Sequence, residues 1–123
     1  MKSAVVRLIH PDNFEQEFVS EEKPLLVLCM PRNEEFAGQI ELLESIGARY
    51  GGELIVGVLD ENSIETFKRN YRFAGTPTFL VLMKGKERGR MLGLADQETL
   101  MELIQSCFIP DEGGSSPNSK VKV

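Results

Sequence analysis

Apolar residues in this chain form short continuous runs, separated by segments in which they recur every three or four positions. The runs at residues 25–30 and 54–59 are apolar throughout and are bounded by turn residues. A continuous apolar run of six residues is typical of a strand covered on both faces. Three more strands are predicted at residues 4–9, 76–82 and 88–93. The run at 25–30 is predicted to be a central parallel strand of a sheet.

The segments between these runs have the spacing of amphipathic helices. Four helices are predicted, one after the turn at residues 10–13 and the others over residues 33–50, 62–71 and 96–107. The first carries Phe18 and Val19 on its apolar side. Asn62 followed by Glu65 has the pattern of a capping box, and Asp96 is predicted to cap the last helix.

The second predicted helix has the clearest start and stop signals. Asn33 is a favourable N-cap residue, and Glu34 and Glu35 follow it where the helix dipole favours negative charge. Gly51-Gly52 is a typical helix end. The apolar positions Phe36, Ile40, Leu43, Ile46 and Tyr50 are predicted to face the core.

Joined in order, these elements read β-α-β-α-β-α-β-β-α. Strands connected through helices are expected to run parallel, with helices on both faces of the sheet. The last two strands are joined by a hairpin at Lys84-Gly85-Lys86, which adds an antiparallel edge. The sequence thus predicts an α/β fold with a central mixed sheet of about five strands flanked by about four helices.

The chain of 123 residues is long enough for one hydrophobic core. We expect one domain over residues 1–108. Residues 109–123 are rich in Gly, Ser, Pro, Asn and Lys, so they are expected to form a disordered C-terminal tail or a short docking arm.

Charge and composition exclude several classes of partner. The net charge is −5 and no basic stripe is present, which argues against nucleic acid and anionic membranes as partners. With two cysteines, Cys29 and Cys107, and the single histidine His10, no metal site and no cofactor are expected. The first residues lack the apolar region of a signal peptide and no run of 18 apolar residues occurs, so we expect a cytoplasmic protein.

The stretch Ala74-Gly75-Thr76-Pro77-Thr78 places a proline at the start of an apolar strand. Proline cannot donate to a sheet ladder, so a proline at the mouth of an apolar strand indicates an edge position or a cis X-Pro turn. A trans proline that simply starts the strand is the alternative. Thr76-Pro77 is the first place to look for a functional site.

From residue 4 to about residue 108 the chain resembles the thioredoxin family. The resemblance rests on the element order, on Gly75-Thr76-Pro77-Thr78 as that family's cis-proline strand, on the Lys84-Gly85-Lys86 hairpin and on Gly93 before the last helix. It implies a thioredoxin-like fold and, in intact members, thiol-disulfide oxidoreductase activity in cell redox homeostasis.

The redox residues of that family are missing. In a gap-free match, Asn33 stands at the position of the attacking thiol and Phe36 at that of the resolving thiol. The buried carboxylate and lysine that the family usually keeps are matched by Val27 and Val58. Disulfide exchange requires a thiolate, so the resemblance implies a degenerate, redox-inactive site.

Three functional hypotheses follow. The first is a non-catalytic protein- or peptide-binding, chaperone-like module, since in this family an extended partner segment lies across the cis-proline loop. Its expected binding residues are Arg32, Asn33, Glu34, Glu35, Thr76, Pro77, Gly93 and Leu94. The second is an oxidoreductase that uses Cys29 as a single thiol, although a buried structural cysteine is the simpler interpretation. A subunit whose oligomeric partner supplies the cysteines is a third alternative.

Overall fold

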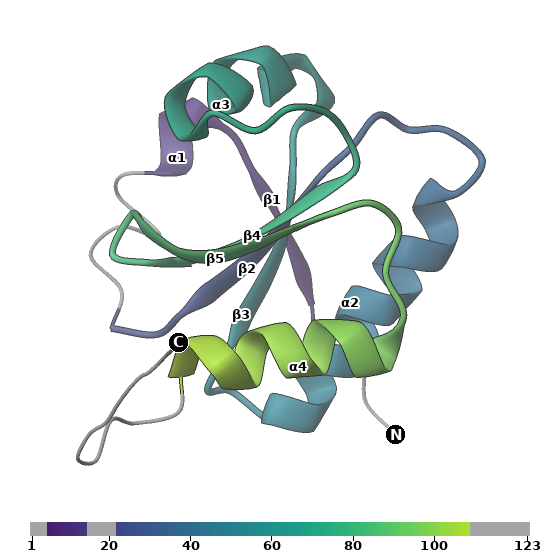
Figure 1. The fold of residues 1–123 in the computed structure, drawn as a ribbon, viewed down its shortest axis with the longest axis vertical. Coiled ribbons are helices and arrows are strands. Elements are labelled where there is room, and N and C mark those ends of the chain that lie inside the picture. The colour runs from purple at the N-terminus through teal and green to yellow at the C-terminus, as the bar shows by residue number, and fades with distance from the viewer. Residues whose placement is uncertain (1–4, 15–21, 109–123) are drawn as a thin grey trace.

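A computed structural model describes residues 5–14 and 22–108 of the chain (Figure 1). Within them, five strands form one mixed sheet in the order β1-β3-β2-β4-β5. The strands are β1 (Val6–Ile9), β2 (Leu25–Cys29), β3 (Ile55–Leu59), β4 (Thr78–Met83) and β5 (Lys86–Leu92). β3 pairs in parallel with β1 and β2, whereas β4 pairs antiparallel with both β2 and β5. The predicted mixed five-stranded sheet with an antiparallel edge is confirmed.

The central position of β2 is also confirmed. It lies between β3 and β4, and all five of its residues are buried. A strand with neighbours on both sides and layers on both faces buries every side chain, and this explains its continuously apolar sequence.

The helices cover both faces of the sheet, as Figure 1 shows. In the described part of the chain they are α1 (Pro11–Phe14), α2 (Phe36–Tyr50), α3 (Ile64–Tyr71) and α4 (Gln97–Phe108), and the 3₁₀ turn η2 (Glu61–Ser63) precedes α3. The count differs from the four expected helices: within residues 5–14 and 22–108, three helices exceed one turn, and α1 is described over four residues. Phe18 and Val19, predicted for the first helix, lie outside the described residues, as does the predicted tail at 109–123.

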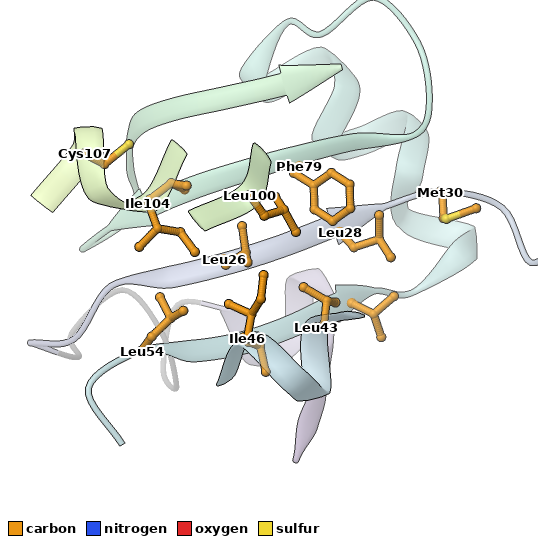
Figure 2. Close-up of a cluster of buried hydrophobic side chains, with 13 residues drawn as sticks. Leu26, Leu28, Met30, Leu43, Ile46, Leu54, Phe79, Leu100, Ile104 and Cys107 are labelled. Carbon is orange, nitrogen blue, oxygen red and sulfur yellow. The ribbon is translucent and has the colours of Figure 1, made fainter. Parts of the chain in front are cut away.

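Two apolar clusters hold the layers together. On one face, α2 and α4 pack on the sheet through side chains such as Leu43, Ile46, Leu100 and Ile104 (Figure 2). On the other face, Phe67 of α3 packs with Phe73 and with sheet residues that include Ile9. The central strands are therefore buried between two apolar layers, whereas the outer strands β1 and β5 remain partly exposed.

Two helix starts differ from the prediction. α2 begins at Phe36 instead of near Asn33, because residues 31–36 form tight turns in which Asn33 N–H donates to the Pro31 carbonyl and Phe36 N–H to the Asn33 carbonyl. The Asn33 side chain accepts from Glu35 N–H at 3.0 Å, so it caps this turn and not the helix. Glu34 and Glu35 consequently precede the helix.

The predicted capping box at Asn62 is likewise not formed, because Asn62 lies within η2 and α3 begins two residues later without a side-chain cap.

Other helix-end signals behave as expected. Gly51 ends α2 in the left-handed conformation at φ 61°, and Thr99 N–H donates to the Asp96 carboxylate at 2.9 Å. The hydrogen bond that the Thr99 hydroxyl donates to the same carboxylate, together with this backbone bond, lowers the pKa of Asp96. No helix of residues 5–14 and 22–108 combines the length and the apolar character needed to cross a bilayer.

Candidate functional site

Three connections meet at one end of the sheet. Cys29 at the end of β2 pairs with Thr78 at the start of β4, and Thr78 pairs with Leu92 at the end of β5. The β2–α2, α3–β4 and β5–α4 connections therefore leave the sheet together, on the right of the view in Figure 1. The residues predicted for binding all belong to these connections.

The α3–β4 connection contains a cis peptide bond between Thr76 and Pro77. This confirms the cis alternative of the sequence analysis. The Pro77 carbonyl accepts from Gly93 N–H at 2.8 Å, and the Thr78 hydroxyl donates to the Gly75 carbonyl at 2.6 Å. These two bonds hold the loop on either side of Thr76 and bring Thr76, Pro77 and Gly93 together.

Thr76 itself is exposed. Within the described part of the chain, neither its backbone N–H nor its carbonyl has a hydrogen-bond partner. Backbone groups that stand unpaired on an anchored loop can pair with an incoming extended segment.

Arg32 is exposed and also makes several contacts within the molecule. Its Nη1 donates to the Met30 carbonyl at 3.1 Å and to the Leu59 carbonyl at 3.0 Å, and its guanidinium carbon lies 4.5 Å from the centroid of the Phe36 ring. Its backbone N–H donates to the Glu61 carboxylate at 3.0 Å. Arg32 thus ties the β2–α2 connection to the ends of β2 and β3 and fixes the position of this connection at the site.

The remaining predicted residues lie on the surface. Asn33, Glu34 and Glu35 are exposed in the turns before α2, and in the described residues neither glutamate forms an ion pair. Leu94 follows Gly93 and is 50% exposed. These residues border the same end of the sheet, and Leu94 adds an apolar element to it.

Two supporting residues were not predicted. The buried Gln39 side chain donates to the Ala95 carbonyl at 3.1 Å and accepts from Ala95 N–H at 3.0 Å, which fastens the β5–α4 connection to α2. An amide on the apolar face, three residues after Phe36 and four before Leu43, was the available sequence signal. Glu61 offered no such signal, because its partner Arg32 is 29 positions away.

A hollow of about 320 Å³ lies beside Thr76. Its walls come from the β2–α2 connection, from the η2–α3 segment and from the α3–β4 loop, and they are formed by Pro31, Glu61, Ile64, Glu65, Lys68, Gly75 and Thr76. A side chain of a segment bound along Thr76 can enter this space.

Cys29 lacks the properties of a nucleophile. Its side chain is fully buried in the cluster that also contains Val27 and Leu80, and burial raises the pKa of its thiol to about 12. Cys107 is buried in the cluster on the opposite face of the sheet, where burial also raises its pKa and its thiol donates to the Arg88 carbonyl at 3.5 Å. Both cysteines are unpaired.

The positions matched to the family's buried polar pair are also apolar in three dimensions. Val27 and Val58 lie on opposite faces of the sheet, in different clusters. The residue of β3 that pairs with Val27 is Gly57, and Ile9 fills the space above that glycine. In residues 5–14 and 22–108 no three His, Cys, Asp or Glu side chains are grouped so as to hold a metal ion.

A scan against models of known protein families found no match for this chain, and a search of the curated proteins found none either.

Proposed function

We propose that this chain is a thioredoxin-like domain that has lost its redox site and binds extended peptide segments of other proteins along Thr76-Pro77. The single observation that carries the proposal is the exposed Thr76, with both backbone hydrogen-bonding groups unpartnered among the described residues, on a loop anchored at Gly75 and Pro77. A partner strand that pairs with such groups gains backbone hydrogen bonds without requiring a thiol.

The chemistry of the site supports binding without catalysis. The family positions of the two thiols are occupied by Asn33 and Phe36, and the nearest cysteine, Cys29, is buried with its pKa raised to about 12. A thiol with that pKa is almost entirely protonated at neutral pH, and the thiolate is the nucleophile in disulfide exchange. The single-thiol oxidoreductase therefore has no observation in its favour. The two unpaired cysteines fit the reducing cytoplasm that we propose as the location.

Catalysis is tested with a disulfide-reduction assay on insulin with an external reductant. We expect no turnover above the reductant alone for the wild type or for Cys29→Ser. Turnover by the wild type that the serine variant loses would overturn the non-catalytic part of the proposal.

Binding is tested on an array of random heptapeptides, followed by NMR with the strongest hits. We expect binding peptides to shift the amide signals of Thr76 and Gly93. Thr76→Pro, which removes the backbone N–H, should lose binding, whereas Thr76→Ala, which keeps it, should not. If Thr76→Pro does not fold, the wild-type shift map decides, and hits that leave Thr76 and Gly93 unshifted contradict the proposal.

A further inference from the structure

The surface around Thr76 has two chemically different sides. On one side lies the hollow of about 320 Å³, whose walls include Glu61 and Glu65. On the other side lies Gly93, which is bonded to Pro77 and flanked by Leu92 and Leu94. These leucines are 60% and 50% exposed, which is unusual for large apolar side chains in this molecule.

The hollow favours a cation. Two carboxylates and one ammonium group, that of Lys68, line it, so its walls carry a net negative charge. Arg32 does not line it, because its guanidinium is directed at the carbonyls of Met30 and Leu59. Glu65 is exposed and, in the described part of the chain, forms no ion pair. A lysine or arginine side chain entering the hollow gains a carboxylate that no other residue of the described chain uses.

An extended segment reaches both sides at once. In a β-strand the side chains of residues i and i+2 point to the same side and are about 7 Å apart. If one residue of the segment pairs with Thr76, one of its two neighbours in the segment lies near Gly75 and the other lies near Pro77. The Gly75 side opens into the hollow, and the Pro77 side adjoins Gly93 and Leu94.

We propose that this surface selects extended segments with a basic residue and an apolar residue two positions apart, the basic side chain in the hollow beside Glu65 and the apolar one over Leu94. This rests on the proposed function and names the class of segment that the site prefers. The bound segment is an extended strand. The residue that stands between the basic and the apolar residue forms the backbone pair with Thr76.

The probe is the peptide acetyl-Ser-Lys-Ser-Leu-Ser-Lys-Ser-amide, in which a lysine stands two positions before and after the leucine, so that either strand direction is satisfied. Its affinity for the full chain is measured by NMR titration beside three matched peptides, with glutamine for both lysines, glutamate for both lysines, or serine for leucine. We expect the glutamine and serine peptides to bind about threefold more weakly and the glutamate peptide more weakly still.

Substitutions in the protein test which of its residues contact the basic and the apolar residue of the peptide. Glu65→Gln should weaken binding of the lysine peptide about threefold and leave the glutamine peptide unchanged. Glu102→Gln, an exposed glutamate of α4 that does not line the hollow, is the matched control and should change neither. Leu94→Ser should weaken the lysine peptide and the glutamine peptide equally. Glu61 is avoided, since its carboxylate also accepts the Arg32 N–H.

The outcomes separate this inference from the proposed function. Equal binding of the lysine, glutamine and glutamate peptides, with shifts at Thr76, would overturn the inference and leave the peptide-binding function intact. Array hits that shift Thr76 while none of the four peptides binds would do the same. Failure of both the array hits and the probes to shift Thr76 overturns both. Shifts at Thr76 and Leu94 that depend on protein concentration without peptide would assign the surface to a second copy of the chain and overturn the inference.

Discussion

The β2–α2 and α3–β4 connections line the same hollow, yet they treat their polar groups in opposite ways. In the β2–α2 connection, Arg32 engages two carbonyls and a carboxylate, and Asn33 bonds within its own turn. In the α3–β4 connection, the residues beside Thr76 are bonded while Thr76 is left without a partner among the described residues.

This difference indicates that the β2–α2 connection supports the site, whereas the α3–β4 connection offers groups for recognition of a ligand. A connection whose Arg32 and Asn33 side chains are bonded within the molecule keeps its shape, whereas an anchored loop with unpaired backbone groups offers a preformed edge. It follows that loss of the Arg32 hydrogen bonds should lower stability, and loss of the Thr76 backbone N–H should weaken binding.

Among single substitutions at neutral pH, the largest effect on stability is expected from Arg32→Met. The variant keeps an apolar stem on Phe36 but removes the charged hydrogen bonds to the Met30 and Leu59 carbonyls. Hydrogen bonds to a charged group contribute about 1.5–3 kcal/mol, so we expect the free energy of unfolding in urea to fall by about 2–3 kcal/mol. A loss below about 0.5 kcal/mol would show that Arg32 does not tie the loop.

A slightly smaller effect is expected from Gln39→Met. This change leaves the N–H and carbonyl of Ala95 without their buried partner and should cost about 1–2 kcal/mol. Amide exchange should become faster at Ala95, while amides of the central strand β2 should follow only the global loss of stability. Uniform acceleration across the chain would mean that Gln39 does not act locally on the β5–α4 connection.

The burial of Cys29 predicts a dependence of stability on pH. Because its thiol has a pKa of about 12 in the folded chain against 9.0 for an unperturbed thiol, the folded state holds the proton more tightly than the unfolded state. This contribution is fully present below pH 9 and is lost as the pH rises toward 12. Between these limits the wild type should lose about 1.4 kcal/mol per pH unit more than Cys29→Ala. Parallel curves for the two proteins above pH 9 would contradict the burial of this thiol.

The smallest effect on stability is expected from Thr76→Ala. The side chain is exposed and forms no hydrogen bond in the described part of the chain, so the free energy of unfolding should change by less than about 0.5 kcal/mol. Urea unfolding of this variant, beside Arg32→Met, tests the comparison directly. Similar losses in the two variants would remove the distinction between the supporting loop and the binding loop.

Much of the fold was predictable from local patterns. The apolar run at Leu25–Cys29 is buried throughout and central in the sheet, and the hairpin forms where Lys84 and Gly85 adopt positive φ values of 54° and 83°. These signals are local, because a strand buried on both faces and a tight turn each demand particular residue types at adjacent positions. The start of α2 was predicted too early, because Asn33 has the composition of a helix cap but the turns at Pro31 and Asn33 use it first.

The candidate site was predictable only in part. The Gly-Thr-Pro stretch was visible in the sequence and directed attention to Thr76. So were Asn33 and Phe36, which stand at the positions matched to the thiols of the family that the chain resembles. The hydrogen bonds that support the site were not predictable, because they join residues far apart in the sequence. The separation is 27 positions between Arg32 and Leu59, and 56 positions between Gln39 and Ala95.

By itself, the sequence determined the order of elements, the apolar interior and the absence of a dithiol, since each depends on residue type and on neighbours along the chain. Tertiary structure decided which polar groups are used and which remain available, because hydrogen bonds between distant segments depend on how the strand ends are brought together. Arg32 turns to the carbonyls of Met30 and Leu59 because the ends of β2 and β3 lie side by side. Among the described residues, Thr76 has no backbone partner, while the Gly75 and Pro77 carbonyls on either side of it are both bonded.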